Sequence, residues 1–565
     1  MTAPLTDRRA AWPLAIPIEV LAYGVIILTA LAVRAAKLGT APLSTFEARQ
    51  ALAVLQLVRP EPVPGGAVES PLVFAGALVL IALFGATNAA VRALPMLGGV
   101  GLVLAPLLFR RRIGRFPALV ASAWLAISPA AVAASRRATG AGLGMLALLL
   151  GLAAADAYLV WRRRASVLLV GVMLGTALLA DYGVLVSVLA VSAGWVFAFA
   201  TDEEEILTRD ALRATTAGLP WSIFAAGLAG AVALLGTLFL IVPNGLGLAA
   251  DQITRFAAGF AARVPGATSL ALALAIYDPA LVVFGFVGAW LASQSASPWQ
   301  RALAGWGVAA GLACLIYPGA LPEHALWAVV PLAGLAGIAL RGMLSMQHEA
   351  PTWGIWAQAA SLVALAAMLF ASLTHHLKAP RLLTIPIDAP LGLGGLNVPL
   401  DLILASLWAI LLVVQWLSSA SLWGPRAAWL GTGTGVLILG SLVAAGQSGA
   451  LAFTRAASPY EPANIAPSQP GLDWLVRTAE EVGELGVGYA TDASVTAQAT
   501  SALVWALRDF HKARFVEQVD PSVDSVMVVT YAGDASPALG SNYVGQDFVI
   551  IQSWTPRGLK LADAI

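Results

Sequence analysis

Thirteen long apolar stretches constrain the fold of this chain more than any other feature of its sequence. A helix that crosses a bilayer needs about 20 mostly apolar residues. Stretches of this kind centre on residues 14–34, 90–109, 116–134, 141–160, 165–181, 183–200, 219–242, 278–294, 302–318, 325–343, 355–374, 399–417 and 426–446. The sequence therefore predicts an all-α polytopic membrane domain over residues 1–446, with about thirteen transmembrane helices.

The composition agrees with a membrane protein. Of the 565 residues, 59% are hydrophobic and 11% are charged, whereas a soluble domain carries about a quarter charged residues. The net charge of +1 gives no basic surface of the kind that nucleic acid binding requires, so nucleic acid is not expected as a partner. Cys314 is the single cysteine, so neither an intrachain disulfide nor a cysteine metal cluster can form.

Arginine runs orient the predicted helices, because cytoplasmic loops are rich in Lys and Arg. The apolar segment 71–85 decides the orientation, and it is short for a span. If it lies at the outer face, the arginine runs at 110–115 and 162–164 both fall inside. If it crosses the membrane, both runs fall outside. We expect the first arrangement, and a tilted full span is the alternative.

This arrangement predicts a multi-pass protein of the inner (plasma) membrane with a cytoplasmic N-terminus. The first apolar stretch follows Arg8 and Arg9 and is too long for a signal-peptide core, so we expect an uncleaved span. The loop 201–217 lies inside and is expected to form a short surface helix. The segments expected outside are the loops 35–89, 243–277 and 375–398 and the tail 447–565.

The tail differs from the rest of the chain. Hydropathy falls near Gln447 and a proline-containing linker follows. The stretch LDWLVRTAEEVGEL, which begins at Leu472, has the pattern of an amphipathic helix, and short apolar runs follow at 487–490, 526–531 and 548–553. The alternation predicts a small extracytoplasmic α/β domain over 447–565, large enough to bury a core of its own.

The first outer loop holds two acidic residues that could carry chemistry. Glu47 opens an amphipathic helix, with Ser44 or Thr45 as its N-cap, and Glu69 precedes the segment 71–85. Two carboxylates at an outer face could serve as a general base and as an orienting or metal-binding group. The alternative is that Glu47 interacts with the helix dipole and Glu69 is a solvated loop charge.

Further polar residues lie at the outer ends of predicted spans. Arg136 and Arg137 put positive charge outside, where a guanidinium suits a lipid-linked phosphate. Pairing with lipid headgroups or with a nearby carboxylate is the alternative. Two pairs of residues at outer helix junctions could line a cavity or could be satisfied structural groups: Asp181 and Tyr182, and Glu323 and His324.

An ordered series of motifs in the first 200 residues resembles the GT-C superfamily of membrane glycosyltransferases. After the first span come STFEARQA (44–51), then ESPLVFAGALVLIALFGATNAAVRALPMLGGV (69–100), and then RRRIGRFPALVASAWLAISPAAVAASRRAT (110–139). The series is similar to that of protein O-mannosyltransferase-like and aminoarabinose transferase-like enzymes. In the tail, ALVWALRDFHKARFVEQVD (502–520) resembles a subgroup associated with the flipping of lipid-linked sugars.

The resemblance implies an inverting transfer of a sugar from a polyprenyl-phosphate-linked donor at the outer face of the membrane. Glu47, or another acidic residue of this loop, would be the general base, and Glu69 matches the family's acidic residue before the loop proline. Arg136 and Arg137 fall where contacts to the donor phosphate are expected. No cofactor is required, and a divalent metal held by two carboxylates is an open alternative.

One departure from the family pattern supports a second hypothesis. Many members carry Asp before this Glu, and here the position holds Phe46. A basic residue often found in place of Asp181 or Tyr182 is also absent. The chain could therefore be an inactive scaffold, or a subunit that binds membrane lipid and other membrane proteins. A transporter is a third class, for which the sequence offers no pair of interrupted helices in corresponding halves.

Overall fold

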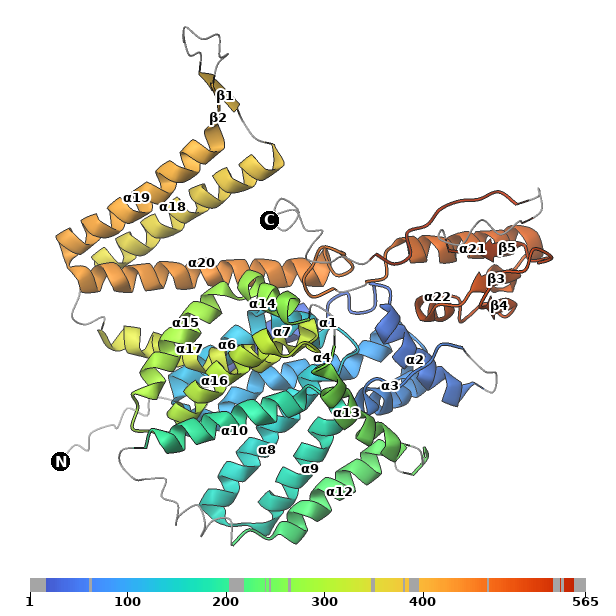
Figure 1. The fold of residues 1–565 in the computed structure, drawn as a ribbon, viewed down its shortest axis with the longest axis horizontal. Coiled ribbons are helices and arrows are strands. Elements are labelled where there is room, and N and C mark those ends of the chain that lie inside the picture. The colour runs from blue at the N-terminus through green and yellow to red at the C-terminus, as the bar shows by residue number, and fades with distance from the viewer. Residues whose placement is uncertain are drawn as a thin grey trace, which may run out of the picture.

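The chain folds into a helical body, a protruding three-helix arm and a small α/β tail (Figure 1). The architecture is known from a computed structural model, which describes residues 17–59, 64–202, 218–238, 240–242, 245–262, 266–346, 351–379, 382–385, 396–464, 467–531, 539 and 543–552. Most of the predicted helix in 201–217 lies outside the described residues. The predicted fold class, a polytopic helical membrane domain with a small C-terminal α/β domain, is confirmed.

Each of the thirteen predicted spans coincides with a helix or with part of a bent pair. The helices are α1 (Ile18–Ala35), α4 (Asn88–Leu104), α6 (Arg115–Ile127) with α7 (Pro129–Ser135), α8 (Ala141–Trp161), α9 (Arg164–Ala180), α10 (Val184–Ala200), α12 (Trp221–Gly236), α15 (Pro279–Ser293), α16 (Pro298–Ile316), α17 (Leu326–Met346), α18 (Thr352–Lys378), α19 (Leu400–Trp423) and α20 (Pro425–Phe453). Among the described residues, seven helices are long and apolar enough to cross a membrane, or nine with two bent pairs. Thirteen crossings therefore stays a prediction.

Shorter elements connect these helices. They are α2 (Thr45–Val58), α3 (Pro71–Phe84), η1 (Ala105–Phe109), α5 (Arg110–Ile113), α13 (Gly245–Gly259), α14 (Gly266–Tyr277) and η2 (Pro322–Ala325). Both α13 and α14 fall in the predicted outer loop 243–277. Five helices, α3, α7, α15, α16 and α20, carry proline in the first turn, where its missing N–H costs no hydrogen bond.

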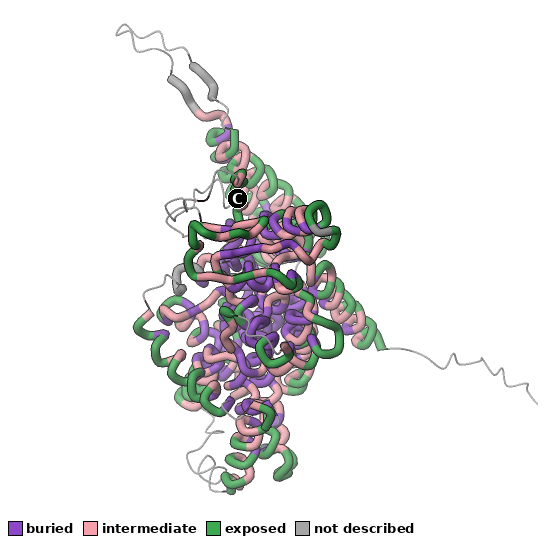
Figure 2. Tube along the Cα trace, turned by 90° about the vertical axis from the view of Figure 1, so that its right-hand side faces the viewer, coloured by how far each residue is buried: buried purple, intermediate pink, exposed green. Residues whose placement is uncertain are grey.

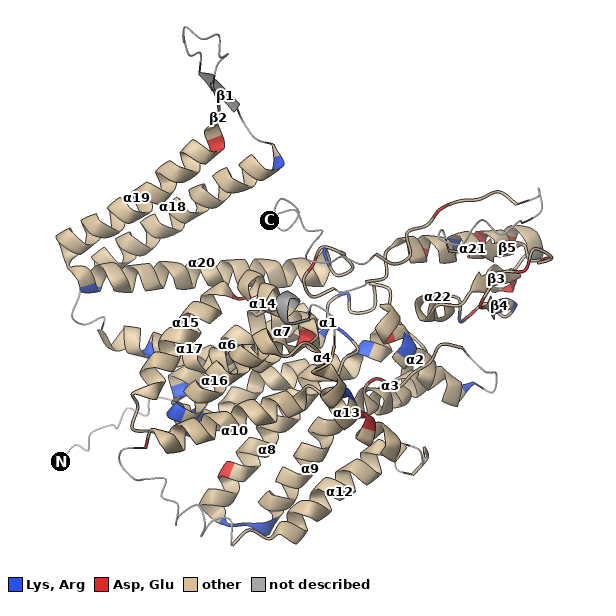
Figure 3. Cartoon of the chain, viewed as in Figure 1, with Lys and Arg blue, Asp and Glu red and all other residues tan. Residues whose placement is uncertain are grey.

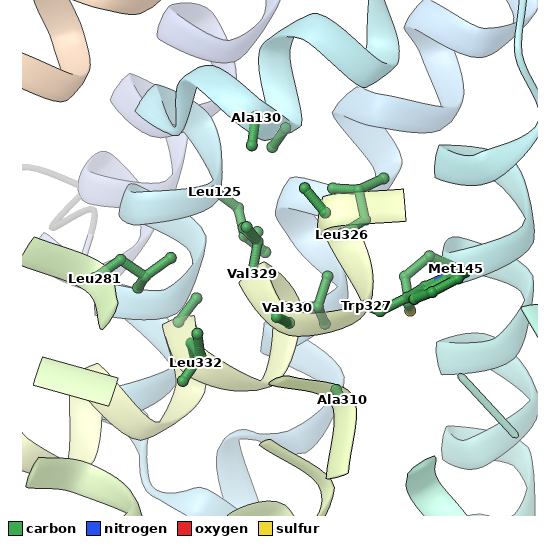
Figure 4. Close-up of a cluster of buried hydrophobic side chains, with 14 of the residues drawn as sticks. Leu125, Ala130, Met145, Leu281, Ala310, Leu326, Trp327, Val329, Val330 and Leu332 are labelled. Carbon is green, nitrogen blue, oxygen red and sulfur yellow. The ribbon is translucent and has the colours of Figure 1, made fainter. Parts of the chain in front are cut away.

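Helix α17 is the centre of the body. Every residue from Leu326 to Leu340 is buried, and the helix packs against α6, α15 and α16. Figure 4 shows its side chains Leu326, Val329 and Leu332 within a cluster of buried apolar residues from the neighbouring helices. A helix that is apolar on all sides is typical of the interior of a membrane bundle.

Two pairs of consecutive helices are joined by a sharp bend. The chain bends by 62° between α6 and α7 and by 95° between α14 and α15. At the first break, Ser128 donates to Asp278 Oδ2 at 2.8 Å, and Asp278 is the residue that precedes α15 at the second break. The carbonyls freed at the end of α6 are also satisfied, because buried Arg34 donates to Leu125 O and Ala126 O at 2.8 and 3.0 Å. Every freed polar group needs such a partner inside a membrane.

The segment α3 enters and leaves the body at one end. At its N-terminus, Ser70 Oγ donates to Ala180 O at 2.6 Å, at the end of α9. Just after its C-terminus, Ala86 O accepts from Arg508 of the tail at 3.1 Å. A helix of 14 residues is about 21 Å long, less than the hydrocarbon core of about 30 Å. Helix α3 is therefore shorter than a full span, and its position at the outer face stays a prediction.

Charged residues gather near helix ends and in the tail (Figure 3). Ion pairs tie one end of the body together, among them Arg110–Glu19 at 3.4 Å, Arg112–Asp156 at 2.6 Å and Arg301–Asp202 at 2.5 Å. The predicted outer loop, the start of α10 and the tail lie at the opposite end. The two faces are thus separated as predicted, and their assignment to inside and outside stays a prediction.

Helices α18, α19 and α20 form the arm, in which many residues are exposed (Figure 2). Helix α20 joins the arm to α6, α7 and α15 of the body. A polar cluster lies where the three arm helices meet: fully buried Gln358 donates to Gln415 and Thr432 at 3.2 Å each and accepts from Ser419. Such interhelical hydrogen bonds hold membrane helices together. The antiparallel strands β1 (Leu382–Ile385) and β2 (Leu396–Pro399) lie at the tip.

The tail has a three-stranded parallel sheet in the order β4–β3–β5, made of β3 (Val495–Gln498), β4 (Ala513–Val516) and β5 (Met527–Val529). Its helical elements are α21 (Gly471–Val487), η4 (Ala490–Asp492) and α22 (Ser501–Ala506). The predicted amphipathic helix is confirmed as α21, whose Leu472, Leu475 and Ala479 pack into the tail core. The apolar run 487–490 is not a strand, because Gly488 ends α21 in a left-handed conformation with φ +83°.

Glycines allow α9 and α12 to pack with their backbones in close contact. A Cβ at Gly171 would lie 2.2 Å from Phe224 O, and one at Gly227 would lie 2.4 Å from Leu168 O. Gly175 continues the same face of α9 one turn later. Small residues four apart are a common basis for helix pairing in membranes.

Substituting Gly227 should therefore separate α9 from α12. We expect Gly227→Leu to lower the thermal unfolding midpoint of the detergent-solubilised chain by several degrees, because the new side chain overlaps the α9 backbone. Gly230→Leu is a matched control on the same helix, since a Cβ there meets nothing within 4 Å. Equal midpoints for the two variants would contradict this packing.

Candidate functional site: an arginine-lined cavity

A cavity of about 370 Å³ lies at the end of the body that carries the tail. Its wall combines the first outer loop, the start of α2, the segment after α7, the loop before η2 and the linker after α20. The charged residues in the wall are Arg49, Arg92, Arg136, Arg137, Glu47 and Glu323. Arginines outnumber glutamates four to two, so the cavity favours an anion.

Glu47 and Arg92 form a buried bidentate ion pair at this cavity. Arg92 Nε lies 2.7 Å from Glu47 Oε1, and Nη2 lies 2.8 Å from Oε2. The carboxylate also accepts from Ser44 N at 2.9 Å and from Ala138 N at 3.0 Å. Ser44 is the N-cap of α2, and its side chain completes a capping box with Glu47. Of the two N-caps that the sequence allowed, the structure selects Ser44.

The pKa of Glu47 follows from these contacts. Burial raises the pKa of this carboxyl group, but the charge of Arg92 and the hydrogen bonds from Arg92, Ser44 and Ala138 outweigh burial and lower it to about 2. Glu47 is therefore ionised at neutral pH. A carboxylate held so strongly is a weak proton acceptor, because a general base works best when its pKa lies near the working pH.

Arg92 uses its whole guanidinium group in this site. Besides the two bonds to Glu47, it donates to Leu38 O, Ala41 O and Pro42 O at 2.8–3.1 Å. An arginine has five N–H donors, and all five have partners here. Arg92 thus holds the loop after α1 against α4 and α2. In the sequence, the only indication that Arg92 has a special role is that it is a charged residue in an apolar stretch.

Arg136, one of the two predicted phosphate contacts, caps helix ends. Its Nη1 donates to Val33 O, Arg34 O and Ala36 O at 2.8–2.9 Å, and its Nη2 donates to Ala452 O at 3.0 Å. These carbonyls lie at the C-terminal ends of α1 and α20, where the helix dipole favours a cation. Arg136 therefore joins the first helix of the body to α20 of the arm.

Arg137, the other predicted phosphate contact, and Glu323 face each other across the cavity wall. Arg137 donates to Asn464 of the linker, and its Nη1 lies 3.8 Å from Glu323 Oε2. The Glu323 side chain is 8% exposed. That distance is longer than a hydrogen bond, so Glu323 is less tightly held than Glu47.

Glu69 lies behind the cavity and not in its wall. It pairs with Arg255 at 2.6 Å and with Arg49 at 3.1 Å. Arg49 itself lines the cavity, and its side chain is 44% exposed. Glu69 can therefore act on the cavity only through Arg49. Sequence reasoning did not single out Arg49, although its spacing places it one half-turn after Glu47 on the same helix.

The remaining predicted residues form a cluster beside the cavity. His324 Nε2 lies 3.1 Å from Asp181 Oδ2, and its Nδ1 accepts from Leu321 N at 3.0 Å. The His324 ring stacks on Trp327 and meets the edge of Tyr182. Tyr182 donates to Gly319 O at 2.8 Å. Asp181, Tyr182 and His324 do not line the cavity and are part of the packing around it. The fourth residue predicted at these junctions, Glu323, does line it.

A metal ion does not fit the described residues of this site. Both oxygens of Glu47 already accept hydrogen bonds, and those of Glu69 pair with two arginines. No group of three or more His, Cys, Asp or Glu side chains within the described parts of the chain could hold a metal ion.

The tail is docked on the outer loop next to this site. Trp505 Nε1 donates to Asn88 Oδ1 at 2.8 Å, and Arg59 at the end of α2 donates to Arg508 O at 2.5 Å. Ser468 of the linker donates to Leu43 O at 2.6 Å. The WALRDF element, Trp505–Phe510, thus attaches the tail to the membrane domain.

The order of the helices, the loop with two short helices and the tail docked beside it can be compared with the folds of solved structures. Among solved structures, the chain is similar to ArnT from Cupriavidus metallidurans bound to undecaprenyl phosphate, with a TM-score of 0.53 and 16% identity. The match covers 90% of this chain and 87% of ArnT. It confirms the predicted GT-C fold.

Two other membrane proteins give lower TM-scores. The archaeal oligosaccharyltransferase AglB from Archaeoglobus fulgidus, in complex with an inhibitory peptide and a dolichol-phosphate, gives 0.48 at 13% identity, covering 88% of this chain and 64% of AglB. The arabinosyltransferase EmbB from Mycobacterium smegmatis gives 0.46 at 15% identity, covering 81% and 44%. No protein-family model matches the chain, and no curated protein matches its sequence.

Removing the charge of Glu47 should destabilise the chain. We expect Glu47→Gln to cost about 3–5 kcal/mol of unfolding free energy, because it leaves Arg92 charged and buried without its partner. Thermal unfolding in detergent measures the loss, and Glu481→Gln on the exposed side of α21 is the control.

The difference in unfolding free energy between wild type and Glu47→Gln should depend on pH in a known direction. Because the folded pKa of Glu47 is lowered to about 2, the stabilisation is fully present above the unfolded value of about 4.3. It declines as the pH falls from there toward the folded pKa. The gap between wild type and Glu47→Gln should therefore be equal at pH 7 and pH 5. A gap that shrinks between these two values would show that the ion pair is weaker than its geometry indicates.

Proposed function

We propose that this chain is a membrane glycosyltransferase that binds a polyprenyl-phosphate-linked sugar in the arginine-lined cavity and transfers the sugar to an acceptor at the outer face of the inner membrane. The observation that carries the proposal is the surplus of arginine in this cavity, within a fold similar to that of ArnT, which was solved bound to undecaprenyl phosphate. The cavity lies at the membrane face that carries the tail, where a lipid-linked donor could present its headgroup.

Arg137 and Arg49 are the two arginines with the most freedom to bind the donor phosphate. Arg92 has all five donors engaged, and Arg136 caps two helices. Arg137 has a long contact to Glu323 and a bond to the linker, and Arg49 is nearly half exposed. A guanidinium group binds phosphate oxygens in a bidentate manner, and a phosphate in place of the neutral Asn464 amide would give Arg137 a charged partner.

Glu323 is our candidate for the proton acceptor. In the proposed step the acceptor hydroxyl oxygen forms a bond to the anomeric carbon, the bond from that carbon to the phosphate oxygen breaks, and the hydroxyl proton passes to a carboxylate. Of the two carboxylates in the wall, Glu47 is saturated with hydrogen bonds and Glu323 is held only loosely. Glu47 would then orient Arg92 and the outer loop, and Phe46 would be compatible with activity.

A scaffold without activity is the second candidate. The closed ion pair of Glu47 and the phenylalanine at position 46 favour it, since both remove an acidic group from the place where the family resemblance expects the base. In that case the cavity would bind a polyprenyl phosphate, or a membrane-protein partner would use the exposed arm, and no sugar would be transferred.

Sugar transfer from radiolabelled polyprenyl-phosphate sugars in proteoliposomes tests the proposal. Wild type should transfer label, and Glu323→Gln should lower the rate by about 10²–10⁴-fold, the usual contribution of general base catalysis. Arg137→Gln should weaken donor binding about tenfold or more, because a hydrogen bond to a charged group is lost. Arg477→Gln on α21 is the control for a lost surface arginine.

Two results would separate the alternatives. Donor binding without transfer by well-folded wild type supports the scaffold and eliminates the enzyme. Full activity in Glu323→Gln, together with lost activity in a folded Glu47→Gln, would return the role of base to Glu47.

A further inference from the structure

An apolar groove lies at the opposite end of the body from the arginine-lined cavity. It has a volume of about 300 Å³ and runs between three neighbouring helices, α8, α9 and α12. Its lining is apolar apart from one tyrosine: Ala155, Tyr158, Leu159, Val167, Val170, Leu219, Trp221 and Phe224. Helices α9 and α12 supply one part of this lining and α8 supplies the other.

Three consecutive arginines lie in the chain between the groove residues Leu159 and Val167. Arg162, Arg163 and Arg164 make the turn between α8 and α9, and all three are exposed. Arg162 lies over the ring of Tyr158 at 5.4 Å and Arg163 over Trp161 at 5.7 Å. Within the described part of the chain, none of the three has an ion pair with a carboxylate.

The turn is built so that these charges stay together. Arg162 has the left-handed φ of +50°, which costs about 1 kcal/mol or more for a residue other than glycine. It ends α8 so abruptly that α9 begins at Arg164. The three guanidinium groups are therefore concentrated at one point, next to the groove.

The residues around the groove are of the kinds found at a membrane boundary. Val170 is six residues after Arg164, a rise of about 9 Å along α9. Two tryptophans flank the same level, since Trp161 is 62% exposed and Trp221 is 59% exposed. Tryptophan and arginine side by side are typical of the boundary between hydrocarbon and headgroups.

We propose that this groove is a binding site for an anionic phospholipid, with an acyl chain on Val167 and Val170 and the phosphate on Arg162–Arg164. Charge complementarity selects the occupant: three cations that have no acidic partner among the described residues attract an anion, and an apolar groove at their side accommodates a hydrocarbon chain. Only an amphiphile with a negative headgroup supplies both. The site is separate from the proposed donor cavity and does not depend on the proposed transfer.

Lipid retention by the full-length protein tests the site. Wild type is reconstituted in nanodiscs of equal phosphatidylglycerol and phosphatidylcholine, released in mild detergent, and its retained lipids are identified by native mass spectrometry. We expect phosphatidylglycerol to be enriched. The triple change Arg162→Gln, Arg163→Gln, Arg164→Gln should lower that enrichment on the order of a hundredfold, at about fivefold for each basic residue near a membrane surface.

A matched triple variant distinguishes a specific lipid site from a general attraction of anionic lipids to positive charge. Arg110→Gln, Arg111→Gln, Arg115→Gln removes the same charge at the same end of the body but away from the groove, and enrichment should stay within a few-fold of wild type. Val170→Trp fills the groove and should abolish retention with all arginines present. In wild type, added salt should weaken phosphatidylglycerol retention, a readout that needs no variant.

Several results of these lipid-retention measurements would overturn the proposal. Equal retention of the two lipids by wild type, equal losses in the two triple variants, or unchanged retention in a folded Val170→Trp would each reject the site. A well-folded wild type that retains no lipid would mean that the groove has another occupant.

Discussion

The ion pair between Glu47 and Arg92 is the contact on which the proposed site depends. It joins the start of α2, the loop after α1, helix α4 and the backbone after α7, and its longest-range hydrogen bond links Glu47 and Ala138, 91 residues apart. Neither charge can be buried alone without a cost of several kcal/mol. Because the two are buried together and all five guanidinium donors are matched, the loop has one defined arrangement, and the cavity beside it has a defined wall.

The other side of the cavity is held by the linker to the tail. Arg136 binds the ends of α1 and α20, Arg137 binds Asn464, and Ser468 binds the outer loop. Residues close together in the sequence, Arg136 and Arg137, thus have different roles: one caps helices and the other faces the cavity. The linker after α20 thus completes a cavity wall that the membrane helices and the first loop supply in part.

Sequence reasoning predicted the fold, which the structure confirms, and it named residues that line the candidate cavity, but it did not predict their partners. The thirteen apolar stretches each correspond to helical structure, and the sequence narrowed the N-cap of α2 to Ser44 or Thr45, of which the structure has Ser44. The pairing of Glu47 with Arg92 was not readable, because 45 residues separate them. Strands β3 and β4 were missed because each has only four residues, and a run of four shows little periodicity.

The sequence by itself determined that this chain is helical, belongs in a membrane and carries a small α/β tail. A bilayer accepts only backbone that satisfies its own hydrogen bonds, so hydropathy and length alone select helices. Only the tertiary structure decided which charges are used. It placed Glu47 in a closed pair, left Glu323 loosely held in the cavity, and put Arg162–Arg164 beside an apolar groove. These contacts depend on distances between segments that are far apart in the chain, so they cannot be deduced from a local pattern of residues.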